Sequence, residues 1–154
     1  MPASRPVALI TGANSGLGKF AALGLVGAKF EGVGTSRDTS GSAPRPGVTL
    51  RDLDVTSDDS VAALIDGVID QFGRIDVLVN IAGAFRFETI ADGDNTNWET
   101  MHRLNLLTAL NTSRAAIPHL VKSTAGRIVN IGAIGALEAG QGMVPYAPSQ
   151  ARVP

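Results

Sequence analysis

Two patterns of apolar and polar positions alternate along this chain of 154 residues. Short apolar runs rich in β-branched residues are typical of strands. Five such runs occur: 7–11 (VALIT), 30–35 (FEGVGT), 48–55 (VTLRDLDV), 75–80 (IDVLVN) and 127–133 (RIVNIGA). Segments with helical periodicity lie between them. Nearly continuous apolar strands separated by helices predict βαβ crossovers, and therefore a parallel sheet that is buried on both faces.

The clearest helix is predicted between Ser57 and Gly73. Its apolar residues recur at intervals of three and four and form one face: Val61, Leu64, Ile65, Val68, Ile69 and Phe72. Thr56, with Asp59 three residues later, predicts a capping box at the start of this helix. Gly73 is suited to the left-handed position that ends a helix.

A second long helix is predicted from about residue 98 to residue 120. The segment 39–47 (TSGSAPRPG) is predicted to be a loop at a place where a regular βαβ repeat would have a helix. This loop is too short to link two domains, so the sequence predicts one domain over residues 1–154.

Composition narrows the class of protein. The net charge is −1 and lysines and arginines form no run, which gives no electrostatic case for binding nucleic acid or an anionic membrane. The absence of cysteine excludes disulfides and thiolate metal sites and fits a reducing compartment. His102 and His119 show no metal-binding spacing. The apolar run near the N-terminus is too short for a signal peptide or a membrane span. We expect a cytoplasmic protein with no metal site.

The glycine-rich stretch ALITGANSGLGKF (8–20) carries the strongest chemical signal. It leads from the first predicted strand through Gly12, Gly16 and Gly18 into a helix. These glycines permit a tight turn, close approach of the backbone to a pyrophosphate, and close packing of helix on strand, while the helix N-terminus offers free N–H groups. The position of the stretch at the first strand–helix turn favours a dinucleotide site over a glycine-rich turn without a ligand.

Further motifs extend this signal along the chain. Residues 11–18 read T-G-x-x-x-G-x-G and resemble the signature of the short-chain dehydrogenase/reductase family. Four later segments resemble family motifs in the family's order: DVT (54–56), which resembles the adenine-pocket segment; NIAG (80–83), in which Ile81 replaces the second Asn of N-N-A-G; the helix segment around Asn105; and GRIVNIGA (126–133), which resembles the fifth strand.

This resemblance covers essentially the whole chain and has consequences for fold, activity and site. It implies a Rossmann-like doubly wound sheet of five parallel strands in the order 3-2-1-4-5. It implies hydride transfer between a nicotinamide and the carbon of a small alcohol or carbonyl substrate. It also implies a set of cofactor-binding residues, which includes the pair Ser36 and Arg37 at the end of the second strand. The full set is Thr11, Gly12, Asn14, Ser15, Gly16, Leu17, Gly18, Ser36, Arg37, Asp54, Val55, Asn80, Ala82 and Gly83.

The end of the second strand distinguishes the two nicotinamide cofactors. An acidic residue there binds the ribose 2′-hydroxyl of NAD, whereas a neutral residue beside an arginine accommodates the 2′-phosphate of NADP. This chain has Ser36 followed by Arg37, and an arginine fork matches phosphate geometry. The sequence therefore favours NADP(H) and leaves NAD(H) possible, because Arg37 can also be a solvated surface charge beside Asp38.

The catalytic positions that the resemblance implies are only partly retained. Tyr146 matches the acid/base tyrosine, and Asn105 matches the asparagine of the proton path. The lysine expected four residues after the tyrosine is Gln150, and the serine expected thirteen residues before it is Ala133. A phenol has a pKa near 10 and is a poor base at neutral pH without a nearby cation. Glutamine supplies no such charge.

Family members continue beyond the active-site helix, so we expect a chain ending at Pro154 to lack the loop over the nicotinamide. We also expect the helix that begins at Tyr146 to have at most about two turns. Three functions stay open: an NADP(H)-dependent oxidoreductase, a nucleotide-binding pseudoenzyme, and a truncated chain acting as a partner through a sheet edge. The apolar strand 127–133 would then be exposed, which predicts a homo-oligomer.

Overall fold

The computed structural model describes residues 5–138 and 140–151 and contains one five-stranded parallel sheet. The strands are β1 (Val7–Ile10), β2 (Glu31–Ser36), β3 (Val48–Asp52), β4 (Val77–Asn80) and β5 (Arg127–Asn130). The helices are α1 (Gly16–Gly27), α2 (Asp58–Phe72), α3 (Asn95–His102), α4 (Thr108–Leu120) and α5 (Tyr146–Gln150), with a π-helical turn at Arg103–Leu107 and a 3₁₀ turn at Ile134–Ala136. The strand order is β3-β2-β1-β4-β5, which confirms the predicted sheet.

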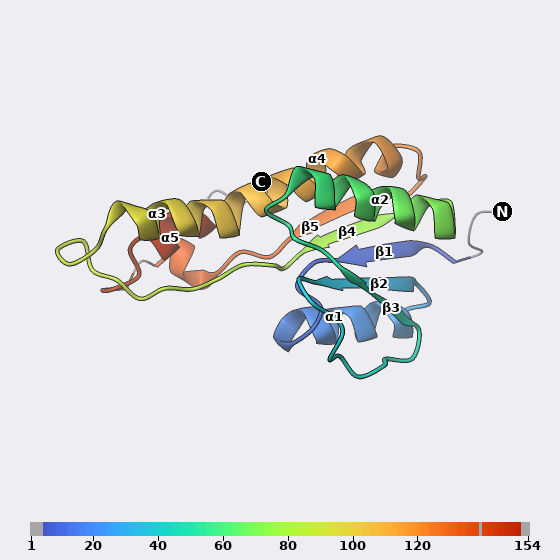
Figure 1. Ribbon diagram of the computed structural model, residues 1–154, viewed down its shortest axis with the longest axis horizontal. Helices are drawn as coiled ribbons and strands as arrows, with labels where there is room; N and C mark the ends of the chain where they lie inside the picture. Colours follow the sequence, from blue (N-terminus) through green and yellow to red (C-terminus); the bar gives the residue numbers. More distant parts are fainter. Residues whose placement is uncertain (1–4, 139, 152–154) are drawn as a thin grey trace.

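Helices cover both faces of the sheet. In Figure 1, α2 and α4 lie on one face and α1 lies on the other. Although β1 is apolar throughout, its side chains still alternate. Val7 and Leu9 join the core beneath α2 and α4, whereas Ala8 and Ile10 join a smaller core on the side of α1. A strand buried on both faces needs this uninterrupted apolar run.

The predicted helix between Ser57 and Gly73 is confirmed, but its cap is not the predicted one. The N-cap is Ser57, whose side chain accepts a hydrogen bond from the Ser60 N–H at 3.2 Å. The Thr56 hydroxyl instead donates to the Asp54 carboxylate at 2.6 Å. Thr56 is therefore held in the preceding turn and cannot cap the helix. Gly73 ends the helix with φ 73°, as predicted.

The second long helix begins earlier than predicted and is not uniform. Asp94 caps it by accepting from the Asn97 N–H at 2.9 Å, so the helix starts at Asn95. Its middle is the π-helical turn, where Asn105 is buried. Single π-helical turns inside α-helices occur frequently at functional sites.

Two strands end three residues earlier than predicted, where the chain turns at the carboxyl edge of the sheet. The predicted strand 48–55 ends at Asp52, and the predicted strand 127–133 ends at Asn130. The segments beyond β4 and β5 then meet, since the Glu88 N–H donates to the Gly142 carbonyl at 2.8 Å. They carry α3 and α5 beyond this edge (Figure 1). The segment 39–47 contains no helix, as predicted.

Candidate functional site

The turn after β1 has the backbone that its glycines were predicted to allow. Gly12 and Gly16 have φ values of 68° and 47°, a region that favours glycine. A Cβ atom on Gly18 would lie 2.2 Å from the Gly12 carbonyl oxygen, so only glycine lets α1 approach the turn this closely. A Cβ atom on Gly12 would lie 3.1 Å from the Ala82 backbone, which places the turn directly against the end of β4.

Thr11 stabilises this contact between the turn after β1 and the chain after β4. Its side chain is buried, and its Oγ1 accepts hydrogen bonds from the N–H groups of Ile81 at 3.0 Å and Ala82 at 3.1 Å. The turn after β1 and the chain after β4 therefore form one unit at the carboxyl edge. Here the crossovers leave the sheet toward opposite faces, which is where open parallel sheets bind ligands.

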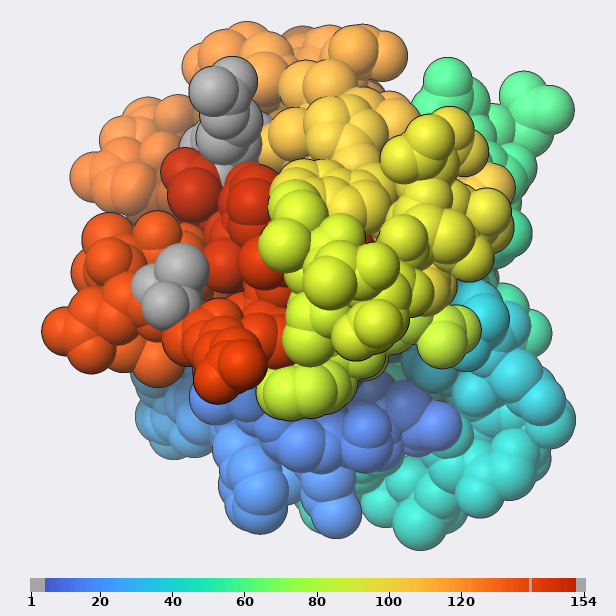
Figure 2. Space-filling view, turned by 90° about the vertical axis from the view of Figure 1, so that its left-hand side faces the viewer, coloured from blue at the N-terminus to red at the C-terminus, as the bar shows by residue number. Residues whose placement is uncertain are grey.

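A groove of about 590 Å³ lies at this place. Figure 2 views this end of the molecule, with the blue glycine loop beside the yellow-green segment that follows β4. Twelve of the fourteen predicted cofactor residues line the groove: Gly12, Asn14, Ser15, Gly16, Leu17, Gly18, Ser36, Arg37, Asp54, Val55, Ala82 and Gly83. The tertiary structure thus brings together segments that lie up to about seventy residues apart in the sequence.

Two carboxylates near the groove, those of Asp38 and Asp54, accept hydrogen bonds from residues two positions later in the chain. Asp54 accepts hydrogen bonds from the Thr56 hydroxyl and N–H, and these, together with the charges of Arg37 and Arg103, hold its pKa below the usual value. Asp38 accepts from the Ser40 N–H, and hydrogen bonding to Ser40 lowers its pKa in the same way. Asp38 is not among the residues that line the groove, whereas Arg37 is.

Two of the predicted cofactor residues, Thr11 and Asn80, are buried and are not among the residues that line the groove. The buried Asn80 joins three elements, because its Nδ2 donates to Ser113 Oγ at 3.1 Å and Asn130 Oδ1 at 2.7 Å, and its Oδ1 accepts from Thr112 Oγ1 at 2.7 Å. These bonds connect β4 to α4 and β5. Any role of Thr11 and Asn80 toward a cofactor stays a prediction.

Asn105 ties α5 to the loop after β4. Its Oδ1 accepts from the Ala84 N–H at 2.7 Å, and its Nδ2 donates to the Ala84 carbonyl at 3.0 Å and to Ser149 Oγ at 2.8 Å. Ser149 in turn donates to the Tyr146 carbonyl at 2.6 Å. The two predicted catalytic residues, Asn105 and Tyr146, are therefore connected through one serine.

The Tyr146 ring packs edge-on against Phe85, with ring centroids 4.8 Å apart. Gln150 and Ala133, at the positions matched to lysine and serine, both line a separate hollow of about 450 Å³. Neither Tyr146 nor Asn105 is among the residues that line this hollow or the groove.

The groove also contains residues that the sequence analysis did not select. They are Thr35, Leu53, Thr56, Ile81, Ala84, Arg103 and Leu104. Arg103 adds a second cation to the groove. The sequence offered one indication of Arg103, because this residue precedes the predicted site residue Asn105 by two positions on a predicted helix. The sequence did not indicate which side of that helix would face the glycine loop.

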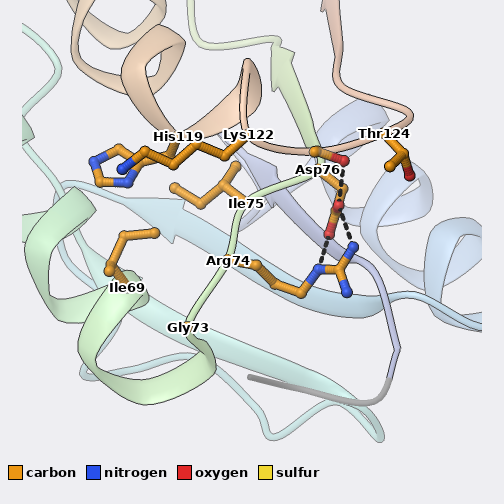
Figure 3. Close-up of a pocket in the computed structure, with 9 residues that line it drawn as sticks. Ile69, Gly73, Arg74, Ile75, Asp76, His119, Lys122 and Thr124 are labelled. Carbon is orange, nitrogen blue, oxygen red and sulfur yellow. Dashed lines mark hydrogen bonds and ion pairs between the residues drawn. The ribbon is translucent and has the colours of Figure 1, made fainter. Parts of the chain in front are cut away.

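A further cavity of about 470 Å³ lies at the opposite, amino edge of the sheet. Figure 3 shows Ile69 and Ile75 on one side of it and the paired Arg74 and Asp76 on the other. Asp76 is buried and accepts two bonds from Arg74, one from Ser123 Oγ and one from the Val7 N–H. Burial opposes ionisation of Asp76, but these hydrogen bonds outweigh it and lower its pKa. This carboxylate joins the starts of β1 and β4.

Within residues 5–138 and 140–151, the structure has no helix long and apolar enough to span a membrane. In the same part of the chain, no group of three or more His, Cys, Asp or Glu side chains is placed to hold a metal ion.

The family model described as short chain dehydrogenase matches residues 6–153. This chain belongs to the short chain dehydrogenase family. The chain is 33% identical to an uncharacterized oxidoreductase of Staphylococcus saprophyticus, over 96% of this chain and 67% of that protein. It is 32% identical to the 3-oxoacyl-(acyl-carrier-protein) reductase of Vibrio cholerae, over 96% of this chain and 62% of that protein.

Solved structures agree with this membership in the short chain dehydrogenases. The ligand-free aldohexose dehydrogenase of Thermoplasma acidophilum superposes with a TM-score of 0.90 at 30% identity, over 97% of this chain and 57% of that one. The chain therefore spans about three fifths of the length of these short chain dehydrogenase relatives.

Proposed function

We propose that this chain binds NADP(H) and belongs to an oxidoreductase that moves hydride between the nicotinamide and an alcohol or ketone carbon. The observation that carries the proposal is the groove at the carboxyl edge of the sheet. There the glycine loop, the end of β2 with Arg37, and the Asp54 turn form one continuous lining. Relatives of this short chain dehydrogenase that act on carbonyl groups support the reaction class.

The residues of the groove fit a dinucleotide. A Cβ atom on Gly16 would meet no atom within 4 Å, so its backbone faces open space at the start of α1. The first N–H groups of this twelve-residue helix have no partner within the helix and carry the positive end of its dipole, which suits a pyrophosphate. NADPH would supply the hydride. The protein residues would bind and orient NADPH and would transfer the proton.

The preference for NADP(H) over NAD(H) rests on the cations of the groove. Arg37 lies at the end of β2 beside the neutral Ser36, where a 2′-phosphate would be recognised, and Arg103 also lines the groove. The neighbouring Asp38 accepts a hydrogen bond from Ser40. A guanidinium in this place can form a bidentate contact with phosphate, which a ribose hydroxyl cannot match.

For the chemistry, we assign Tyr146 as the proton donor to the carbonyl oxygen and Asn105 as the residue that fixes the tyrosine helix and continues the proton path. The hydrogen bonds from Asn105 through Ser149 to the Tyr146 backbone carbonyl support the role of Asn105 in fixing this helix. The roles in proton transfer are supported by the match of both residues to the family's catalytic positions. Gln150, at the position matched to the lysine, gives the Tyr146 phenol no positive charge to assist proton transfer.

Ala133 and Gln150 favour a second candidate, a domain that binds the nucleotide with little or no turnover. Alanine offers a substrate carbonyl no hydrogen bond, and glutamine offers the tyrosine no charge. One preorganised donor is worth roughly 10² to 10³ in rate. The two candidates share the groove and differ only in chemistry.

Two measurements on the 154-residue chain distinguish these candidates. Titration by NADPH fluorescence tests the groove, and we expect saturable binding that is tighter for NADPH than for NADH. NADPH oxidation with a panel of small ketones and aldehydes tests the chemistry, with Tyr146→Phe as control. Turnover that Tyr146→Phe abolishes supports the oxidoreductase, and binding without turnover supports the second candidate. A chain that binds neither cofactor contradicts the proposed function.

We further propose a single domain that acts in the cytoplasm and self-associates through β5. Ile128 and Val129 of this strand are 37% and 43% exposed, although they lie in a parallel sheet. Among the described elements, β5 pairs with β4 alone. An edge strand of this kind offers unpaired N–H and carbonyl groups to a second copy.

A further inference from the structure

The segment 39–47, between β2 and β3, is the most irregular crossover of the sheet and is held at both ends. The Asp52 carboxylate accepts hydrogen bonds from the Thr39 N–H at 2.8 Å and the Thr39 hydroxyl at 2.7 Å. At the other end, the Val48 N–H donates to the Arg45 carbonyl at 3.0 Å, across a turn in which Gly47 has φ 75°. The backbone of Arg45 is therefore fixed beside the start of β3.

From this position Arg45 reaches the glycine loop. Its Nη1 donates to the Ala13 carbonyl at 2.6 Å, and its Nη2 donates to the Asn14 carbonyl at 2.7 Å and to Asn14 Oδ1 at 3.2 Å. Ser42 of the same segment donates to Asn14 Oδ1 at 2.5 Å. The guanidinium is partly buried, and its hydrogen bonds hold two consecutive carbonyl groups of the turn.

These bonds orient the N–H groups of the loop. In a trans peptide the carbonyl and the following N–H point in opposite directions. When Arg45 holds the carbonyls of Ala13 and Asn14, the N–H groups of Asn14 and Ser15 point away from Arg45. Asn14 and Ser15 line the groove, whereas Arg45 is not among its lining residues. The guanidinium thus holds the loop from outside the groove, and the two N–H groups face away from it.

We infer that Arg45 is a positioning residue for dinucleotide binding, which preorganises the glycine loop for the phosphates. The inference rests on the proposed function of the groove. Consecutive N–H groups that point into one concavity form an anion site, and the permanent charge of arginine behind them adds to its positive potential. Arg45 therefore differs from Arg37, which would contact only the 2′-phosphate and would matter for NADPH alone.

The test compares NADPH and NADH affinities of the 154-residue wild type with those of four variants. We expect Arg45→Ala to weaken both cofactors by roughly tenfold or more and by the same factor, since it removes charged hydrogen bonds that hold the loop. Arg45→Lys should restore part of the loss. Ser42→Ala, which spares the backbone carbonyls, should have a smaller effect. Arg5→Ala, which removes an arginine paired with Glu31 at the amino edge, should have none.

Amide hydrogen exchange without ligand gives a readout independent of affinity. In Arg45→Ala we expect faster exchange at the Ala13 N–H of the loop, which donates to the Thr35 carbonyl at 2.7 Å, with the N–H groups of β4 unchanged. If Arg45→Ala does not fold, Arg45→Lys carries the same comparison. Unchanged affinities and exchange, or a loss confined to NADPH, would overturn the inference alone. A wild type that binds neither cofactor overturns the inference together with the proposed function.

Discussion

At the scale of single residues, three arginines divide the work proposed for the groove. Arg37 and Arg103 line it, and Arg45 holds the glycine loop from behind. A guanidinium can bind a phosphate or fix a backbone, and position alone decides between these roles. Substitution of each arginine should therefore give a different pattern of cofactor affinities.

We expect Arg37→Ala to reduce the affinity for NADPH by roughly tenfold and to leave that for NADH within about twofold, because only NADPH has a phosphate for this side chain. Fluorescence titration with both cofactors measures the two constants. Equal affinities of the wild type for NADPH and NADH would contradict the assignment of this arginine to the 2′-phosphate.

Asp76 governs stability at the other edge of the sheet. We expect Asp76→Asn to lower the free energy of unfolding by about 2–3 kcal/mol at pH 7, less than for a fully buried ion pair because the Arg74 side chain is 37% exposed. The pKa of Asp76 is lowered in the folded state, so its contribution is present above the unfolded pKa of about 3.9 and is lost as the pH falls further.

Urea unfolding of wild type and Asp76→Asn at pH 7, 5 and 3 measures this contribution. The difference between the two proteins should be the same at pH 7 and 5 and smaller at pH 3. Asp66→Asn, on the exposed side of α2, serves as the control and should change little. A difference that does not shrink at pH 3 would show that the charge of Asp76 is not what stabilises the fold.

At the scale of elements, α5 depends on its neighbours. It has five residues, fewer than an isolated helix needs in water, so packing and hydrogen bonds must hold it. Asn105, in the π-helical turn, provides this support through Ser149, and Phe85 provides it through the Tyr146 ring. The irregular turn in the long helix and the placement of Tyr146 are therefore connected.

We expect Ser149→Ala to loosen α5 locally. Removing the serine leaves the buried Asn105 amide without one acceptor and the Tyr146 carbonyl without its donor, at a cost of roughly 1–3 kcal/mol. Hydrogen exchange should rise in α5 and remain unchanged in α2. Equal exchange in α5 for wild type and variant would show that packing alone holds this helix.

We expect the double substitution Ala133→Ser and Gln150→Lys to return little or no carbonyl reduction to the 154-residue chain. It places a donor and a cation near Tyr146, but groups that act as a unit give little while another member is imprecisely placed. Tyr146, Ala133 and Gln150 do not line the groove, and misplacement by about 1 Å costs on the order of a hundredfold. Robust NADPH oxidation with a simple ketone would instead identify the two lost side chains as the cause.

At the scale of the whole molecule, the two ends of the sheet differ in purpose. The carboxyl edge carries the groove and α5, while at the amino edge Asp76 and its partners join the starts of β1 and β4 beside the smaller cavity. The two edge strands of the sheet, β3 and β5, also differ from each other. Of these, β5 is the more apolar.

We expect self-association that increases with concentration and depends on β5. Val129→Lys should shift the protein toward the monomer, because lysine on an edge strand discourages pairing with another chain. Val121→Lys, at the exposed end of α4, is the matched control and should not. Light scattering across a wide range of concentrations measures the mass. A wild type that is monomeric throughout would contradict this proposal.

The architecture and many of the residues that line the groove follow from the sequence alone. Apolar runs and helical periodicity are encoded within ten or so residues, and right-handed crossovers between parallel strands leave few arrangements. The glycine loop could be predicted because its turn requires glycine. The end of β2 could be placed at the groove because its position follows from the strand order. For these reasons Gly12, Gly18 and Arg37 could be selected from the sequence, and they line one groove, while their role toward a cofactor stays a prediction.

Contacts between residues that follow no local repeat in the sequence form only when the chain folds. Arg45 and the Ala13 carbonyl are 32 residues apart, and Asn105 and Ser149 are 44 apart. Such pairs depend on the path of irregular loops, which no repeating pattern describes. The cap of α2 moved from Thr56 to Ser57 for a similar reason, since the Asp54 turn had already taken the threonine hydroxyl. Periodicity predicts elements, whereas competition among polar groups for partners is resolved only when the chain is folded.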